Sequence, residues 1–354
     1  MPPRILIVGA GPTGLTAAVE LARRGIVATV IEKRDAPSRL SRAVGILPAS
    51  MRILEPSGVA EAIAAEAVAF RNAVIHRGAE PIARLRLDQS PDPHHRLLGL
   101  PQDRTETLLR EAFEKMGGTV RFGCPLDRVE QGSEEVRAEI GGEIERFDHV
   151  IGADGTNSRL RDSLGLAYSG FDLPGDWSIA DVIAPDWPHQ QDFCIFLKKA
   201  GKVAIVAPLA PHRFRIIAND PDALEALPMP IDETEIRRQA PFRISVRQAE
   251  RYSAGRAFLA GDAAHCHSPV GGRGMNLGIA DAADLARRFT ENGLDGYHRA
   301  RHKAGSETIR FTERGRRNVM SKSRIRRAAL IGLIKTVCAI PALNRLAVRA
   351  LLSG

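Results

Sequence analysis

The residues whose types and spacing best suit chemistry lie in the stretch 258–285. A short apolar run ends at Gly261 and Asp262, a glycine-rich loop follows, and a helix is expected to begin near Met275. Glycines let a backbone pass close to a flat ligand, and the first amides of a helix have no partner inside it. Their partial positive charge favours a ligand edge that is or becomes negative. The stretch therefore predicts an anion-facing site, with a plain glycine-rich turn as the alternative.

The N-terminal region has the pattern of a dinucleotide-binding unit. A strand, a helix and a second strand are expected at 4–8, 15–24 and 28–31, with Gly9-Ala-Gly11-Pro-Thr-Gly14 after the first strand. In such a unit the first glycine makes the tight turn, the second admits the pyrophosphate, and the third lets helix and strand pack closely. Glu32 ends the second strand, where its carboxylate would bind the adenosine ribose.

A third motif, Gly152-Ala-Asp154-Gly155-x-x-Ser158-x-x-Arg161, follows an expected strand in mid-chain. In this order, the three motifs resemble those of the single-component FAD-dependent monooxygenases of the para-hydroxybenzoate hydroxylase type, the class A flavoprotein monooxygenases. They spread over the chain from Gly9 to about Leu285. The resemblance implies non-covalent FAD, with the pyrimidine edge of its ring against the late loop.

The resemblance also implies roles for individual residues. The ADP part of FAD would contact Gly9, Gly11, Pro12, Thr13, Gly14, Glu32, Lys33, Arg34 and Arg42. The rest of the cofactor would contact Gln102, Asp154, Gly155, Gly261, Asp262, Pro269, Gly272, Gly274, Met275 and Asn276, with Asp262 on the ribityl chain. Arg161 is expected to support the middle motif. His265 and His267 are expected to be packed or hydrogen-bonded histidines.

The expected fold class is α/β, with a Rossmann-like FAD-binding domain interleaved with an antiparallel-sheet substrate domain. The FAD-binding domain is assigned to 1–72, 97–165 and 252–290, the substrate domain to 73–96 and 166–251, and a basic helical segment to 291–354. Candidate substrate residues are Trp177, Phe193, Phe196, Arg213 and Arg215. Strand alternation alone leaves open which of their side chains face the pocket.

By resemblance, NAD(P)H reduces FAD, O₂ adds at C4a, and the flavin hydroperoxide hydroxylates an aromatic, phenolic or polyketide-like small molecule. No catalytic base can be named from the sequence. One alternative is an FAD-dependent reductase or dehydrogenase without oxygen transfer, and another is a non-catalytic flavin-binding protein. A disulfide oxidoreductase is disfavoured because a second GxGxxG unit and a redox cysteine pair are absent from the sequence.

The formal net charge of +8 is concentrated near the C-terminus, where residues 299–327 contain eleven Lys/Arg and two Glu. A solvated helix face, or contact with an anionic partner or membrane surface, would explain this charge. Nucleic acid is disfavoured because no Trp or Tyr lies among these arginines. Lys335 and Pro341 interrupt the apolar tail, so no membrane-spanning run is expected.

The four cysteines are far apart and predict neither a disulfide framework nor a metal site. An apolar strand at 5–8 leaves no room for a secretion signal after the initiator Met. Both observations favour a cytoplasmic location.

Overall fold

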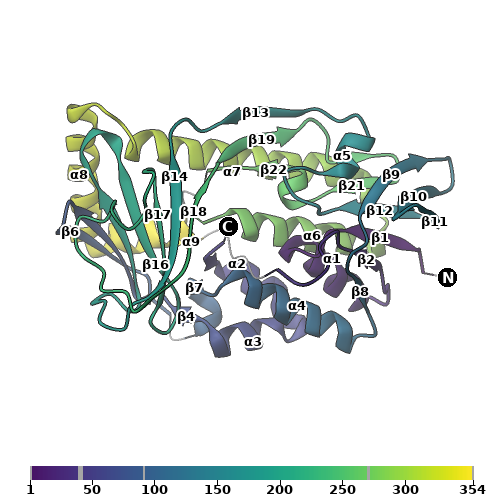
Figure 1. Ribbon diagram of the computed structural model, residues 1–354, viewed down its shortest axis with the longest axis horizontal. Coiled ribbons are helices and arrows are strands. Elements are labelled where there is room, and N and C mark those ends of the chain that lie inside the picture. The colour runs from purple at the N-terminus through teal and green to yellow at the C-terminus, as the bar shows by residue number, and fades with distance from the viewer. Residues whose placement is uncertain (1, 39–42, 91, 269–271, 353–354) are drawn as a thin grey trace.

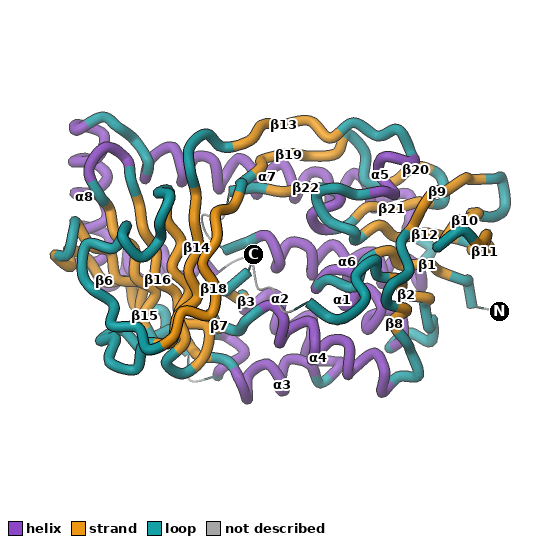
Figure 2. Tube along the Cα trace, in the orientation of Figure 1, coloured by secondary structure: helices purple, strands orange, loops and turns teal. Residues whose placement is uncertain are grey.

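The computed structural model describes residues 2–38, 43–90, 92–268 and 272–352. Two β-sheets lie towards opposite ends of an elongated molecule, and helices run between them (Figures 1 and 2). Two residues predicted to bind the cofactor, Arg42 and Pro269, lie outside the described ranges. The α/β fold predicted from the sequence is confirmed.

The nucleotide-side sheet has the strand order β20 (Ser253–Ala254), β21 (Ala257–Leu259), β12 (His149–Gly152), β1 (Ile5–Val8), β2 (Thr29–Ile31) and β8 (Val120–Arg121). All neighbours pair in parallel except β20 with β21. β1 is a continuous buried apolar run, as parallel strands covered on both faces require. The carboxyl ends of β1, β2 and β12 therefore meet at one edge, where all three predicted motifs converge.

Helices and a small meander complete the core of this sheet. The helices α1 (Pro12–Ala22), α4 (Gln102–Lys115) and α6 (Gly274–Glu291) bury apolar residues in the same core as the sheet. The meander consists of β9 (Leu126–Gln131), β10 (Val136–Ile140) and β11 (Glu143–Phe147). Gly141 and Gly142 join β10 to β11 in a hairpin turn with positive φ angles of 58° and 85°, which glycine adopts without strain.

The larger sheet has the order β18 (Glu235–Phe242), β14 (Trp177–Ile183), β17 (Arg213–Ala218), β16 (Val203–Ala210), β15 (Asp192–Leu197), β5 (Asn72–Arg77) and β6 (Glu80–Arg86). Its pairs are antiparallel except β15 with β5, which run parallel. The parallel pair arises because β5 and β6 come from a segment about a hundred residues earlier in the chain.

Short elements link the two large sheets. A three-stranded sheet leads from one to the other and consists of β13 (Tyr168–Asp172), β19 (Ser245–Ala249) and β22 (His265–Cys266). A further small sheet has the strand order β3 (Gly45–Ile46), β7 (Leu98–Gly99) and β4 (Val68–Ala69). The remaining short helices are α2 (Pro48–Leu54), α3 (Val59–Glu66) and α5 (Arg159–Ser163).

The basic C-terminal segment forms the helices α7 (Tyr297–Val319), α8 (Arg324–Ala339) and α9 (Pro341–Leu352). Figure 1 shows α7 running along the molecule to the larger sheet, where α8 covers the end and α9 turns back. Within the described residues, no single helix is long and apolar enough to cross a membrane. Only α8 and α9 taken together reach that apolar length, and they are bent by 107° at Pro341.

Candidate functional site

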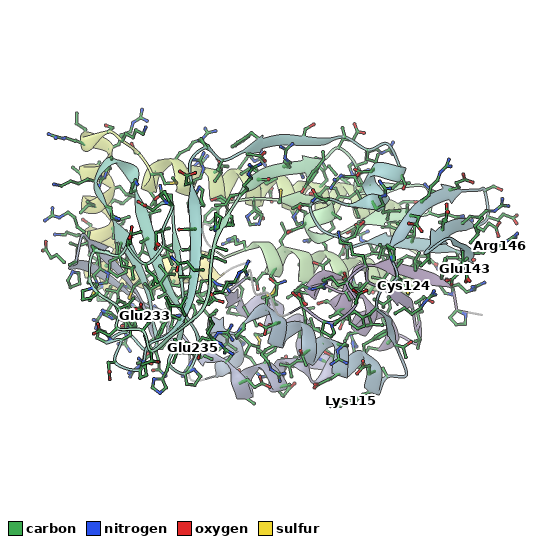
Figure 3. The ribbon with its side chains drawn as sticks, viewed as in Figure 1. Lys115, Cys124, Glu143, Arg146, Glu233 and Glu235 are labelled. Carbon is green, nitrogen blue, oxygen red and sulfur yellow. The ribbon has the colours of Figure 1, made fainter. Side chains whose placement is uncertain are left out.

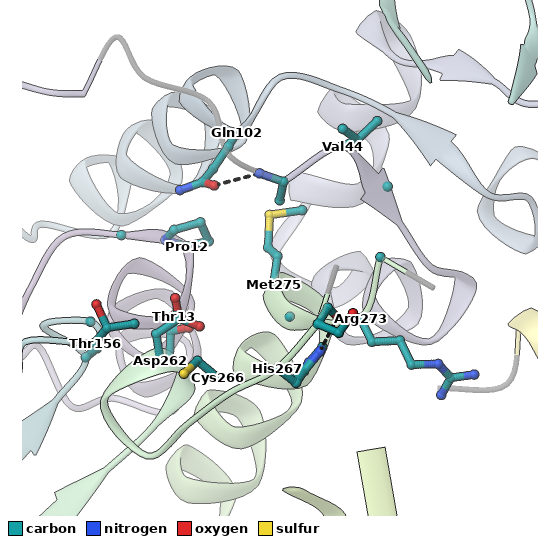
Figure 4. A pocket seen from close by; sticks show the side chains of 18 of the residues that line it. Pro12, Thr13, Val44, Gln102, Thr156, Asp262, Cys266, His267, Arg273 and Met275 are labelled. Carbon is teal, nitrogen blue, oxygen red and sulfur yellow. Dashed lines mark hydrogen bonds between the residues drawn. The ribbon is translucent and has the colours of Figure 1, made fainter. Parts of the chain in front are cut away.

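A cavity of about 1260 Å³ lies between the two large sheets and takes its lining from both. Pockets for drug-sized ligands usually measure roughly 300–1,000 Å³, so this one can hold a dinucleotide-sized ligand and more. Its lining contains most of the predicted cofactor-binding residues, namely Gly9, Gly11, Pro12, Thr13, Glu32, Lys33, Arg34, Gln102, Asp154, Gly155, Asp262, Gly272, Gly274 and Met275. Figure 4 shows several of them around the cavity.

The first glycine motif forms one end of the cavity. Gly9 has a φ of 104°, and a Cβ there would lie 2.5 Å from the carbonyl oxygen of Ala153. A Cβ on Gly14 would lie 1.9 Å from the carbonyl oxygen of Gly9, so Gly14 serves packing and does not line the cavity. At Gly11, by contrast, no described atom lies within 4 Å of an added Cβ. The backbone at Gly11 therefore presents open space, as close approach of a pyrophosphate requires.

Glu32 follows β2 and faces the same end. Its Oε2 accepts a hydrogen bond from the Ala10 amide at 2.9 Å, and its Oε1 accepts one from the Arg34 amide at 3.0 Å. The Arg34 guanidinium also donates to this carboxylate at 3.1 Å. Burial alone raises the pKa of Glu32, but these hydrogen bonds lower it overall. Glu32 is thus held as a carboxylate that can accept hydrogen bonds from a ribose.

Gln102 begins α4 and links two parts of the site. Its Oε1 accepts a hydrogen bond from the Ala43 amide at 3.1 Å (Figure 4), and its Nε2 donates to Glu106 at 2.8 Å. Burial raises the pKa of Glu106 to about 7. A carboxyl group that titrates near neutrality therefore stands directly behind a residue of the cavity wall.

Asp154 lines the middle of the cavity. Its Oδ2 accepts hydrogen bonds from the amides of Arg159 and Leu160 at 2.7 and 3.2 Å, whereas its buried Oδ1 has no hydrogen-bond partner among the described residues. Burial raises its pKa. An orphaned buried oxygen facing a cavity is a position where a ligand donor would be expected.

Arg161 supports this motif from behind. Its guanidinium donates to the carbonyl oxygens of Ala263 and Thr156 at 3.1 and 3.0 Å, and it stacks 3.9 Å from the centre of the Tyr168 ring. The middle motif and the late loop are therefore fixed to each other.

The late loop and the start of α6 form the other end of the cofactor region. Asp262, Gly272, Gly274 and Met275 line the cavity, and no described side chain caps the first turn of α6. Gly261 lies behind the lining, because a Cβ there would meet the Thr13 hydroxyl at 2.4 Å. The free amides of this turn leave a positive helix end at the cavity.

Asn276, predicted to contact the cofactor, is instead buried beside the lining. Its Oδ1 accepts hydrogen bonds from the Leu47 amide and the Ser50 hydroxyl, both at 2.8 Å. Its Nδ2 donates to the carbonyl oxygens of Gly45 and Gly272, both at 2.9 Å. All of its hydrogen-bonding groups are engaged, so Asn276 anchors the helix start to the β3–α2 region.

The two histidines of the late stretch differ in their surroundings. His265 is fully buried and lies 2.6 Å from Asp281, whose other oxygen accepts from Arg301 at 2.6 Å. His267 lines the cavity, and its Nδ1 lies 2.9 Å from the Ser268 carbonyl oxygen. Burial lowers the pKa of His267 to about 4, so it is neutral at physiological pH. A carbonyl can only accept, so Nδ1 carries the proton in this neutral ring.

The larger sheet supplies an apolar wall. Alternate residues of β15, β16 and β17 face the cavity, and together with neighbouring segments they contribute Phe70, Ala73, Leu87, Leu97, Phe193, Ile195, Ile205, Ala207 and Ile217. Of the predicted substrate residues, only Phe193 is in this lining. By the sheet register, Trp177, Arg213 and Arg215 lie on the same face of the sheet as the lining residue Ile217, and only Phe196 faces the other side.

The other predicted substrate residues lie outside the lining for clear reasons. Phe196 follows Phe193 by three positions, so it points to the opposite face and stacks on His76 with ring centres 4.5 Å apart. Trp177 packs against Phe242 in an apolar cluster that backs onto the lining residues Ile195, Ile205 and Ile217, but it does not reach the cavity itself. Both Arg215 and the less buried Arg213 pair with Asp181, and Arg215 donates to both of its oxygens at 2.7 Å.

Sequence reasoning missed the contribution of the C-terminal helices. Phe311, Arg314, Gly315 and Asn318 of α7 and Leu351 of α9 also line the cavity. The Arg273 guanidinium lies 4.5 Å from the centre of the Phe311 ring and donates to the carbonyl oxygens of Ala350 and Leu351, both at 3.3 Å. The one sequence signal was Phe311, the sole aromatic residue between 298 and 354.

The arrangement fits FAD. The N-termini of α1 and α6 both face the cavity, and each carries the partial positive charge of a helix end. The N-terminus of α1 suits a pyrophosphate, and that of α6 suits a ring that gains negative charge. Glu32 and Asp262 add carboxylate groups to the same lining. The fold and site thus define a flavoprotein of the dinucleotide-binding α/β class.

Comparison with known proteins agrees with the assignment as an FAD-binding protein. The family model described as "FAD binding domain" matches residues 3–223 and 222–312. The 6-methylpretetramide 4-monooxygenase of Streptomyces rimosus is 31% identical over 311 residues, which cover 82% of this chain and 56% of that protein. The rifampicin monooxygenase of Streptomyces venezuelae is 31% identical over 338 residues, covering 86% and 69%. The chain therefore belongs to the FAD-binding family that includes the class A flavoprotein monooxygenases.

Two further similarities bear on fold and function. The crystal structure of p-nitrophenol 4-monooxygenase from Pseudomonas putida has a TM-score of 0.89 over 100% of this chain and 98% of that chain, and at 23% identity it shows the fold. The dialkyldecalin synthase of Streptomyces rugosporus is 30% identical over 377 residues, covering 98% of this chain and 79% of that protein. The chain spans little more than half of the Streptomyces rimosus relative, so whole-protein activity is taken up below as a proposal.

Proposed function

We propose that this chain is an FAD-dependent monooxygenase that hydroxylates an aromatic small molecule with O₂ and NAD(P)H. The balanced reaction inserts one oxygen atom into a C–H bond, while NAD(P)H and a proton reduce the other to water. The observation that carries the proposal is the continuity of one cavity from Gly11 and Glu32 to the apolar wall at Phe193 and Ile217. A cofactor cradle and a hydrophobic substrate wall thus share one space.

Each part of the chain has a defined task in this proposal. When bound, FAD would accept the reducing equivalents and activate O₂. The start of α6 offers unpaired amides that favour negative charge beside Gly274 and Met275. The apolar wall excludes water from the substrate region. Neutral His267 presents the unprotonated Nε2 of its ring beside Gly274, without a hydrogen-bond partner among the described residues.

The apolar wall also supports the substrate class. Hydrocarbon and aromatic side chains surround this part of the cavity, which favours a largely apolar aromatic or polyketide-like substrate. Two relatives carry names of oxygenases acting on 6-methylpretetramide and rifampicin, which agree with that class.

A second candidate is a reaction without oxygen transfer, which would keep FAD as a bound group. The relative that matches 98% of this chain is named a synthase, and its name specifies no oxygenation. A reductase or dehydrogenase falls in the same alternative. A non-catalytic flavin-binding protein would bind FAD without consuming NAD(P)H under any ligand.

Isotope labelling decides between these candidates. The FAD-loaded protein is screened with phenolic and polyketide-like compounds for stimulated NAD(P)H oxidation, and the product is then made under ¹⁸O₂. One labelled oxygen atom in the product is expected. A verified product without label would rule out oxygen transfer and favour the second candidate.

Cofactor contacts are tested separately. Asp262→Ala removes the acceptor proposed for the ribityl hydroxyls, so FAD occupancy should fall without a change in the fold. Flavin absorbance per protein after gel filtration measures this occupancy. Full retention of FAD would reject the ribityl contact.

The domain division is also a proposal. Residues 1–72, 97–165 and 252–290 would bind FAD, and 73–96 with 166–251 would bind substrate, although α7 and α9 of the 291–354 segment share the lining. A cytoplasmic location is proposed because the four cysteines, all within the described residues, form no disulfide.

A further inference from the structure

The C-terminal helices carry a charge pattern that the proposed reaction does not use. Residues 314–354 contain ten Lys/Arg and no Asp or Glu. Figure 1 places α8 at the end of the molecule, beyond the larger sheet. Its inward side packs against β6, yet none of its residues is fully buried. Arg316 pairs with Glu313 and Arg314 lines the cavity, so the remaining cations lie from Arg317 onwards. Such a cationic surface attracts anionic surfaces and repels a second copy of itself.

An apolar stripe runs along the outward side of α8. Ile325 and Leu333 are 82% and 62% exposed, and the exposed positions Ala329, Thr336 and Ile340 continue the same line. The spacings of three and four residues place Ile325, Ala329, Leu333 and Thr336 on one helix face, and Ile340 follows directly after the helix. Single exposed aliphatic side chains are common on protein surfaces, but several in a row on one face indicate a surface that a partner covers.

Cations flank the exposed side of α8. With about 100° of rotation per residue, Arg326 lies at one edge of the stripe. Arg324 and Lys335 lie at the far edge of the exposed side, with the small residues Ala328 and Gly332 between them and the stripe. All three are exposed. This arrangement lets an apolar face enter the acyl boundary of a bilayer while the flanking cations reach the headgroups.

A shallow pocket of about 390 Å³ lies beside this face, on the flank of α8 that turns towards Arg77 at the end of β5. It is lined by Arg77, Arg324, Arg327, Ala328, Ile331 and Gly332. Arg77 pairs with Glu80 at 3.3 Å, and Arg327 donates to the Lys198 carbonyl. Arg324 has no hydrogen-bond or ion-pair partner among the described side chains. Three guanidinium groups around one small hollow suit a phosphate headgroup.

We infer that the outer face of α8 is a binding surface for anionic phospholipid membranes. The apolar stripe would bury itself in the interface, its flanking cations would meet the headgroups, and the three-arginine pocket would take a lipid phosphate. The helix lies on the membrane and does not cross it, which agrees with the 107° bend between α8 and α9. This surface is separate from the cofactor cavity, so its test does not depend on the proposed reaction.

Vesicle sedimentation tests the inference. The protein with its FAD is mixed with sucrose-loaded vesicles of phosphatidylcholine alone, or with about 30% phosphatidylglycerol added. Binding is expected with the anionic vesicles and should weaken at least about tenfold as salt rises to about 0.5 M. Equal binding to both vesicle types would overturn the inference.

Matched variants locate the surface. Leu333→Glu and the pair Arg324→Glu/Arg326→Glu should each weaken binding about tenfold or more, because each acts on one of the two attractions. The controls are Ile144→Glu and Arg146→Glu on β11, an exposed aliphatic residue and an exposed arginine at the opposite end of the molecule (Figure 3). Melting temperature and flavin content verify that each variant is folded.

Three outcomes would overturn the assignment of this surface. Two of them are unchanged vesicle binding by Leu333→Glu and an equal loss of binding in Ile144→Glu. The third is a dimer in light scattering that Leu333→Glu converts to a monomer, because a second copy would then cover the stripe.

Discussion

His265 Nε2 lies 2.6 Å from Asp281 Oδ2, and neither side chain is exposed to solvent. The same Asp281 oxygen accepts a hydrogen bond from the Gly261 amide at 3.1 Å, and the other oxygen accepts from Arg301 at 2.6 Å. One buried carboxylate of α6 thus holds the cofactor loop, β22 and α7 together. The position of Asp262 in the cavity is therefore set from behind, by groups that do not line it.

Asp281→Asn should lower the free energy of unfolding by about 3–5 kcal/mol, because it leaves Arg301 without its buried counter-charge. Urea unfolding measures the change. Asp284→Asn on the same helix is the control, since Asp284 pairs with Arg287 and Arg288 near the surface. It should cost less than about 1 kcal/mol. Equal costs would contradict a special role for the buried carboxylate.

Alanine substitutions at two glycines of the first motif should have different effects, one on stability and the other on FAD binding. Gly14→Ala forces a Cβ to within 1.9 Å of the Gly9 carbonyl oxygen, so the FAD-free protein should lose stability. Gly11→Ala meets open space and should leave the FAD-free melting temperature nearly unchanged, yet it should weaken FAD binding. Melting curves and flavin titration separate the two effects. Tight FAD binding by Gly11→Ala would contradict the position of the pyrophosphate.

The FAD-free protein should lose stability as pH rises through neutrality because of Glu106. Its folded-state pKa is raised to about 7, so the folded state holds a proton that the unfolded state releases near its ordinary value. This contribution is full below about pH 4.5, falls by about 3 kcal/mol as the pH rises from about 4.5 to 7, and is absent at higher pH. Urea unfolding from pH 5 to about pH 8 measures it. Glu106→Gln should flatten the slope, and an unchanged slope would rule out Glu106 as its source.

Alanine substitutions at two phenylalanines of β15 should affect different properties, one the folding stability and the other substrate binding. Phe196→Ala removes a fully buried ring stacked on His76 and should cost about 3–5 kcal/mol of folding free energy. Phe193→Ala should cost less and instead raise KM for an aromatic substrate, because Phe193 lines the cavity. Denaturation and steady-state kinetics are compared for both. A reversed pattern would mean that the inward face has been misassigned.

The nucleotide end of the site was predictable because its requirements are local. Gly9 takes a φ of 104° in the tight turn, and a Cβ on Gly14 would meet the Gly9 carbonyl oxygen, so much of the constraint lies within one strand-turn-helix unit and the spacing indicates the structure. The hairpin turn at Gly141 and Gly142 is likewise determined by the conformation of its own two residues. These features need no knowledge of distant neighbours.

The substrate end was less predictable because it depends on long-range packing. Phe193 and Phe196 look equivalent in sequence, and only the pairing of β15 with β5 and β16 decides which one faces the cavity. The edge strand β18 has a charged, weakly alternating sequence that gave no strand signal. Phe311 and Leu351 reach the cavity only through the packing of α7 and α9.

The hydrogen bonds from Arg273 to Ala350 and Leu351 have a consequence for the order of events during synthesis. Gly9 and Leu351 line one cavity, although the ribosome makes them some 340 residues apart. The nucleotide cradle can assemble early, but the cavity wall closes only after α9 has been translated. A prematurely terminated chain would therefore present a cofactor-binding surface next to an open, unprotected substrate chamber.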